Sequence, residues 1–171
     1  MERIEKCVAR LTEDQVWLRG HETENAVGNL LLHLAGNVRQ WIISGVDGTP
    51  DTRDRDSEFN AHEGPSKSDL LAGLRATVEE GCKVIEPLTP ERLATVVHVQ
   101  KYDVSVLEAI YHVVEHFAQH TGQVIFATKM LTGEELGFYT HRASDCILRR
   151  NAASRRAGAV RIDRGIGPGF E

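Results

Sequence analysis

The chain has 171 residues, of which 41% are hydrophobic and 26% are charged, and its formal net charge is −5. This composition is that of an ordinary globular domain, and it excludes collagen-like, fully disordered and multi-span membrane proteins. The mildly acidic charge also argues against nucleic acid as the default partner.

Three cysteines are present, Cys7, Cys82 and Cys146, and no CxxC pair occurs among them. This argues against a disulfide framework and against a cysteine-rich zinc site, whereas free thiols suit a reducing cytoplasm. The first residues lack the apolar core and cleavage site of a signal peptide, and no stretch approaches the ~20 apolar residues of a membrane span. We therefore expect a cytoplasmic protein that makes no membrane contact.

Two helices are predicted in the first third of the chain, over about residues 1–18 and 25–44. Asn25 is the predicted N-cap of the second helix, whose apolar residues then recur at spacings of 4, 3, 4 and 3. Glycines and Pro50 end this helix. A polar loop over residues 45–66 follows, longer than most connections between helices, and loops of this length are often functional or mobile.

The second half of the chain predicts a third helix, from Ser66 or Ser68 to about Glu86, and a short extended piece over residues 94–103. The fourth helix has the clearest pattern, over about residues 104–131, and Gly133 is its natural stop. Its predicted apolar stripe is Leu107, Ile110, Val114, Phe117, Thr121, Val124, Thr128 and Leu131. We expect an all-α four-helix bundle over residues 1–141.

The last residues, 142–171, differ in composition from the rest. They contain seven arginines and three acidic residues, and they lack apolar periodicity. We expect a loosely ordered basic appendage. Two alternatives are a short extra helix over 143–157 and a basic arm that touches nucleic acid or an acidic partner.

Histidines recur along the fourth predicted helix. His112, His116 and His120 are each four residues apart, which places them on one helix face. The spacing lets the imidazoles of His116 and His120 converge on one metal ion at ~2.0–2.1 Å per bond. Gln123 falls in the same arc of the helix.

A third ligand must come from another segment, and His33 is the best candidate. It lies in the middle of the second predicted helix, at the margin of the apolar stripe. Three neutral imidazoles leave a coordination position open, which is the arrangement of catalytic rather than structural zinc sites. The small or polar neighbours Gly36, Asn29 and Asn37 would leave room for water and substrate.

The same histidines also admit a plainer interpretation, as packed or solvent-facing side chains. The chain has no HExxH motif, because the glutamate nearest the pair is Glu115, directly before His116. Glu115 lies ~100° from His116 around the helix, so we expect it to face away from the pair. The catalytic base therefore stays unassigned.

Two stretches resemble the DinB superfamily of metal-dependent proteins, namely NAVGNLLLHLAGNVRQWIISGVDG and AIYHVVEHFAQHTGQVIFATKMLTG. The most specific part is the HxxxHxGQ pattern, here His116, His120, Gly122 and Gln123. The stretch 53–59, RDRDSEF, is similar to a subfamily of uncharacterised DinB-like proteins.

The resemblance implies a four-helix bundle in up-down-down-up order with one divalent metal, often nickel or zinc, and in many members a homodimer. The family's three ligands map onto His33, His116 and His120, and His112 onto a position beside the site or facing the substrate. Characterised relatives act with low-molecular-weight thiols, as bacillithiol-type transferases or as a mycothiol-dependent maleylpyruvate isomerase.

Together these features favour a metal-dependent thiol transferase or hydrolase that acts on a small electrophilic molecule. The metal would activate a thiol or a water. We expect Asn29 and Gln123 to orient ligands or substrate, and Arg39 is the nearest cation for a substrate carboxylate, unless it is only a solvated surface residue. The loop 51–63 would act as a lid, with Asp54, Arg55 and Asp56 as its polar elements.

Two rival hypotheses use different features of the chain. A non-catalytic helical module of the stress response would bind metal weakly or not at all and would dimerise through a helix face. A DNA-damage protein would depend on the basic tail, 142–171, for nucleic-acid contact.

Overall fold

The computed structural model describes residues 1–138, and the predicted Arg-rich tail, 142–171, lies outside the described residues. The elements are α1 (Glu2–Val8), α2 (Glu13–Val16), α3 (Val27–Val38), the π-helix η1 (Arg39–Ser44), α4 (Arg55–Asn60), α5 (Lys67–Ile85), α6 (Pro90–Leu93), β1 (Val96–Val99), β2 (Tyr102–Ser105) and α7 (Val106–Thr132).

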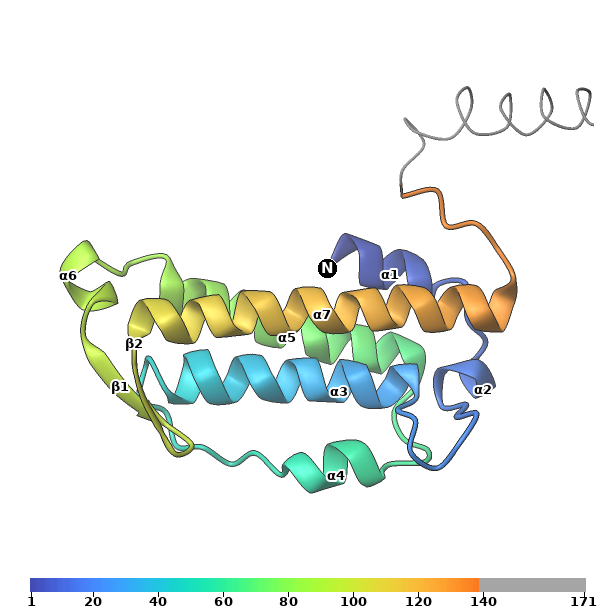
Figure 1. Ribbon diagram of the computed structural model, residues 1–171, viewed down its shortest axis with the longest axis horizontal. Coiled ribbons are helices and arrows are strands. Elements are labelled where there is room, and N and C mark those ends of the chain that lie inside the picture. The colour runs from blue at the N-terminus through green and yellow to red at the C-terminus, as the bar shows by residue number, and fades with distance from the viewer. Residues whose placement is uncertain (139–171) are drawn as a thin grey trace, which may run out of the picture. The chain divides into compact units, whose positions relative to one another are not determined.

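The helices α1, α3, α5 and α7 lie along one another (Figure 1). Helix α3 packs against both α5 and α7, and α1 packs against α7. Along the chain, α1 and α7 run in one direction and α3 and α5 in the other, which is the expected up-down-down-up order (Figure 1). The prediction of an all-α fold is confirmed.

The single helix predicted over residues 1–18 is wrong, because the structure has two short helices there. Thr12 starts the second one with a capping box, in which its hydroxyl accepts from the Gln15 amide and the Gln15 side chain accepts from the Thr12 amide. Residues of both helices still face the core, with Ile4 and Val16 fully buried.

The second predicted helix is α3 followed by the π-helix η1, and its N-cap is Ala26 rather than Asn25. Alanine has no side chain that can cap, so the Asn29 amide oxygen accepts from the Ala26 N–H instead. The prediction of an Asn25 cap is therefore wrong.

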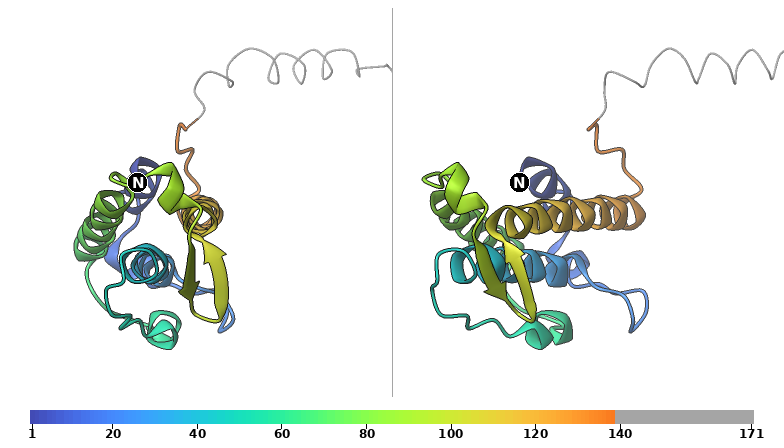
Figure 2. Two further views of the ribbon diagram at one scale, coloured as in Figure 1. Left: turned by 90° about the vertical axis from the view of Figure 1, so that its left-hand side faces the viewer. Right: turned by 60° about the vertical axis from the view of Figure 1, so that its left-hand side comes forward.

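The connection predicted as a loop over residues 45–66 contains α4, which Asp54 caps by accepting from the Ser57 amide. Helix α4 packs on the outer side of α3 (Figure 2). The helix predicted from Ser66 is α5, which Ser66 caps by accepting from the Asp69 amide.

The extended piece predicted over residues 94–103 is the antiparallel hairpin of β1 and β2, with Val99 opposite Tyr102. Gln100 starts the two-residue turn with a φ of 58°, a left-handed conformation that such tight hairpin turns require. The hairpin lies beside the start of α7 (Figure 2).

Helix α7 begins with a Ser105–Glu108 capping box and ends at Gly133, whose φ of 67° suits glycine. The predicted stripe is wrong at its first half, because Leu107 and Val114 are 57% and 60% exposed. Val106 and Val113 are buried in their place. A stripe at alternating spacings of 3 and 4 averages 3.5 residues per turn, so it drifts around a straight helix of 3.6 residues per turn.

Within residues 1–138, no helix combines the length and the apolar character needed to cross a bilayer. Both cysteines of this part of the chain are free thiols, Cys7 buried and Cys82 exposed. Burial raises the pKa of the Cys7 thiol, against a smaller lowering by a hydrogen bond with Thr128.

Candidate metal centre

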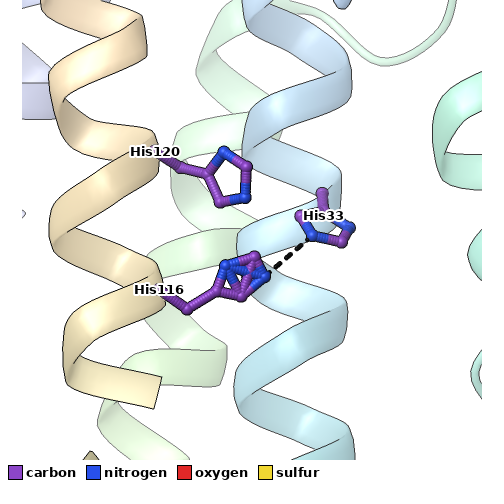
Figure 3. Close-up of side chains that lie close together, drawn as sticks. All are labelled: His33, His116 and His120. Atoms are coloured by element: carbon purple, nitrogen blue, oxygen red, sulfur yellow. Dashed lines mark hydrogen bonds between the residues drawn. The ribbon is translucent and has the colours of Figure 1, made fainter. Parts of the chain in front are cut away.

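Three histidines from two helices meet between α3 and α7 (Figure 3). His33 is buried on α3, and His116 and His120 are half-buried on α7. One ring nitrogen of each residue can be chosen so that all three lie within 4.8 Å of one another. The closest pair is Nε2 of His33 and Nε2 of His116, 2.9 Å apart.

Helix geometry explains this convergence. His116 and His120 are one turn apart on α7, and their ring centroids are 4.3 Å apart. Helix α3 packs directly against α7, and it carries His33 to ring-centroid distances of 4.8 Å from His116 and 5.0 Å from His120. The cluster therefore depends on the packing of α3 against α7 as well as on the local spacing.

The ring of His33 is oriented by a buried carboxylate. Nδ1 of His33 lies 2.9 Å from Oε2 of Glu58, and both side chains are nearly inaccessible to solvent. Nη2 of Arg53, which can only donate, lies 3.0 Å from the same Nδ1, but the contact with the carboxylate is the shorter one. An ionised carboxylate can only accept a hydrogen bond, so we place the proton of the His33 ring on Nδ1. The lone pair of Nε2 then points toward His116 and is available to a metal ion.

Arg53 keeps this carboxylate ionised. Its guanidinium forks onto Glu58, with Nε 2.7 Å from Oε1 and Nη2 2.8 Å from Oε2. Burial acts to raise the pKa of Glu58, but the hydrogen bonds and charges of Arg53 and His33 outweigh it, and the net pKa is lowered. At neutral pH the carboxylate is therefore charged and can hold the Nδ1 proton of His33.

Gly36 makes room for this buried pair on the surface of α3. A Cβ at position 36 would overlap Oε1 of Glu58 and Nε of Arg53. The space that we expected Gly36 to leave for water and substrate is therefore filled by the Arg53–Glu58 ion pair.

The two histidines on α7 are held in their neutral forms. Burial lowers the pKa of His116 to about 4, helped by the nearby charges of His120, His33, His112 and Arg53. Burial also lowers the pKa of His120, against the opposing effect of its hydrogen bond with Gln123. Because the Gln123 amide oxygen accepts from Nδ1 of His120, Nε2 of His120 keeps its lone pair.

These residues fit a divalent ion such as zinc or nickel. The donor set is three imidazoles, a ligand type that both metals accept. Two tetrahedral zinc ligands at ~2.0–2.1 Å from the ion lie about 3.3 Å apart. The closest pair of ring nitrogens is nearer than this, at 2.9 Å, whereas the three nitrogens together span up to 4.8 Å, so the rings would have to draw together to hold one ion. The hydrogen bonds of Glu58 and Gln123 to the remote nitrogens are those expected behind metal-binding histidines.

The other residues predicted for the site fall into two groups. His112 lies beside the cluster, with its ring centroid 5.6 Å from that of His116 and 4.0 Å from that of Trp41. Gln123 contacts His120. Arg39 instead pairs with Glu80, 3.1 Å away at the surface.

Asn29 and Asn37 are both buried on α3. The Asn29 side-chain amide donates to the carbonyls of Glu58 and Ala61, each at 2.8 Å, so it fixes the end of α4 rather than facing the cluster. Glu115 is exposed, in agreement with its expected direction.

Arg53, Glu58 and Phe59 are site residues that the reasoning from spacing missed. The ring of Phe59 lies 4.6 Å from that of His33. Within the loop 51–63 we assigned the polar role to Asp54, Arg55 and Asp56, all of which are exposed. Arg53, Glu58 and Phe59 all lie in the RDRDSEF stretch, residues 53–59, and its similarity to DinB-like proteins is the signal that could have identified them.

The arrangement defines a helical bundle with a three-histidine centre capable of holding a metal ion. The chain belongs to the family described as "Protein of unknown function (DUF1572)", whose model matches residues 1–141. A search of curated proteins gave no match.

Two solved structures have a similar fold. The conserved protein of locus from Enterococcus faecalis is 17% identical, with a TM-score of 0.61, over 78% of this chain and 91% of that one. A DinB-like protein from Bacillus subtilis, YjoA, is 18% identical, with a TM-score of 0.60, over 81% of this chain and 90% of that one. At these identities the likeness establishes a DinB-like fold.

Proposed function

We propose that this protein is a metal-dependent enzyme of the DinB superfamily, in which His33, His116 and His120 hold one zinc or nickel ion. The observation that carries the proposal is the convergence of three ring nitrogens within 4.8 Å, with a buried carboxylate behind the most buried ring. The DinB-like fold of the neighbouring structure supports the superfamily assignment.

The chemistry that such an ion supplies when bound is Lewis-acid activation of a water or a low-molecular-weight thiol. The chain's own residues prepare its binding. Glu58 holds the proton on Nδ1 of His33, Arg53 keeps Glu58 charged, and Gln123 fixes the ring of His120. The reaction we propose is transfer of the thiol to a small electrophilic molecule, or hydrolysis of that molecule.

Glu58 does not suit the role of general base in this reaction. Both of its oxygens already accept hydrogen bonds from Arg53 or His33. His112 lies beside His116, and we keep it as a residue next to the site or facing the substrate.

The experiment is a His120→Ala variant of protein purified without an affinity tag. We expect the wild type to contain about one equivalent of metal. The variant should lose that metal while its helical circular dichroism is unchanged, because His120 is a half-buried side chain on a long helix. His98→Ala is the matched control, since His98 also pairs through Nδ1 but is exposed on β1. Equal metal content in wild type and His120→Ala would overturn the proposal.

A second candidate function, a non-catalytic metal-binding or dimerisation module, is favoured by exposed apolar side chains along α7. These are Leu107, Tyr111 and Val114, which lie on one face of α7 and are 57–67% exposed. We propose that these side chains form the interface of a homodimer, because a two-fold axis would place them against the same residues of a second copy. A Val114→Glu variant should then shift the mass measured by light scattering from dimer to monomer.

We assign the function to residues 1–141, and the loosely ordered basic tail over 142–171 stays a prediction. The cytoplasmic location expected from the sequence stays a prediction.

A further inference from the structure

A cavity of about 940 Å³ is lined by residues of α3 and α7 that neighbour the histidine cluster, although none of the three histidines lines it. It lies between the segment that joins α2 to α3 and the second half of α7, and most of its lining is apolar. Leu18, Phe126 and Met130 line it and are 54–70% exposed, so they present apolar surface that a ligand could cover. This volume lies within the range of small-molecule sites.

The cavity reaches the cluster through Gln123. This residue lines the cavity, and its amide oxygen accepts from Nδ1 of His120. Leu30, one turn before His33 on α3, lines the cavity as well. A ligand in the cavity therefore lies against residues that adjoin two of the three histidines.

Arg19 is the arginine in the cavity wall, and none of the ion pairs within residues 1–138 includes it. Its Nη2 donates to Oδ1 of Asn29 and to the carbonyls of Phe59 and Ala61 at 2.6–2.9 Å. These contacts hold the guanidinium in place without neutralising it. Its Nε is buried and has no hydrogen-bond partner in the described structure.

The acidic residue of the lining, Glu24, does not neutralise the positive charge of Arg19. One oxygen of its carboxylate accepts from the Gly20 amide and so closes the turn between them. The first turn of α3, whose Val27 lines the cavity, has no acidic side chain, and its N-cap Ala26 has no side-chain oxygen. The positive end of the α3 dipole thus adds to the charge of Arg19.

We propose that the cavity binds the substrate as a small organic anion, with its carboxylate or sulfonate on Arg19 and its apolar body along Leu30 and Phe126. This inference rests on the proposed function, and it names the substrate class for the same site. The reactive end of the molecule lies toward Gln123 and His120.

The test uses two fluorescent probes that share an aromatic body and differ in charge. They are 8-anilinonaphthalene-1-sulfonate, an anion, and N-phenyl-1-naphthylamine, which is neutral. An Arg19→Gln variant should weaken binding of the anion by about tenfold or more, because a charge-assisted contact is lost, and leave the neutral probe unchanged. Arg39→Gln is the matched control and should leave both affinities unchanged within about twofold, because Arg39 is in a surface pair.

A second variant covers the case in which Arg19→Gln does not fold. Gly122 lines the cavity on α7, and a Cβ there would meet open space. Gly122→Leu should keep or raise the melting temperature, because leucine favours the helix more than glycine does. Its side chain would fill part of the cavity, so both probes should bind about tenfold more weakly.

Either of two results overturns the inference. One is equal weakening of both probes, or of neither, in a folded Arg19→Gln variant; the other is wild-type affinity for both probes in Gly122→Leu. Metal content measured on the same samples keeps the two proposals apart. A wild type without metal whose anion binding depends on Arg19 overturns the metal centre alone. Full metal content with anion binding independent of Arg19 overturns the anion site alone.

Discussion

A histidine that faces a buried carboxylate has a different role from one that faces an exposed carboxylate, and this protein contains both. His33 meets Glu58 where both side chains are at most 9% exposed, whereas His98 meets Asp103 where both are at least 65% exposed. In the buried pair the carboxylate fixes which nitrogen carries the proton, so the other is left for a metal. In the exposed pair water competes for both groups.

The first prediction replaces the buried carboxylate by its neutral isostere. Glu58→Gln keeps the shape but loses the charge, and its amide cannot accept from both Arg53 and His33 as the carboxylate does. We expect zinc affinity to fall about 10–100-fold in competition with a chromophoric chelator. Asp103→Asn should leave the affinity unchanged. Equal affinities in the two variants would show that Glu58 does not orient His33.

The second prediction concerns the acid stability of the metal-free protein. The pKa of His116 is lowered to about 4 in the folded state, against about 6.5 for an unfolded histidine. Between these values the unfolded chain binds more protons, so the free energy of unfolding should fall as the pH drops from 6.5 toward 4. Glu58, whose pKa is lowered, loses its stabilising charge only at still lower pH.

Urea unfolding at several pH values checks this second prediction. His116→Gln should flatten the dependence of the unfolding free energy on pH in that window, whereas His98→Ala should not. A wild-type unfolding free energy that stays constant from pH 6.5 to 4.5 would contradict the lowered pKa of His116.

The histidines could be chosen from the sequence, but their supporting residues could not. The four-residue spacing of His116 and His120 and the place of His33 inside an apolar helix are local features. The contact of Glu58 with His33 depends on a segment 25 positions along the chain folding back across α3. No spacing rule predicts this, and the polar residues that we selected there instead, Asp54, Arg55 and Asp56, face solvent.

At the scale of the elements, α4 matters because it carries Glu58 to α3. Asn29 on α3 holds the end of α4 through the carbonyls of Glu58 and Ala61, and it also accepts from Arg19. One buried amide therefore joins the helix that carries His33, the helix that carries Glu58 and the wall of the cavity. The sequence predicts the helices α3, α5 and α7 well, because each has strong periodicity, whereas the single-turn α2 and α6 depend on caps.

The third prediction concerns removal of the Asn29 side chain, the joint between α3 and α4. Asn29→Ala would leave the Ala26 amide and the carbonyls of Glu58 and Ala61 without their partner, so the free energy of unfolding should fall by roughly 2 kcal/mol or more. Asn60→Ala, an exposed change on α4, should cost less than about 0.5 kcal/mol. Urea denaturation measures both. A loss in Asn29→Ala no larger than that in Asn60→Ala would show that the joint does not stabilise the fold.

At the scale of the whole molecule, the order of the helices in the bundle brings together histidines that are 83 positions apart in the sequence. Helices α3 and α7 run in opposite directions side by side (Figure 1), and this packing brings the middle of one helix to the middle of the other. The apolar periodicity of both helices was enough to predict the bundle. It was not enough to fix the rotation of α7, because a repeat of 3.5 residues drifts by several tens of degrees over four turns.

The most direct test of the three-histidine centre is X-ray absorption spectroscopy at the zinc and nickel edges on tag-free protein of known metal content. We expect about one ion per chain with three imidazole nitrogens, at ~2.0–2.1 Å for zinc, and the loss of one of them in His33→Ala. An ion without imidazole ligands, or a spectrum that His33→Ala leaves unchanged, would contradict the three-histidine centre.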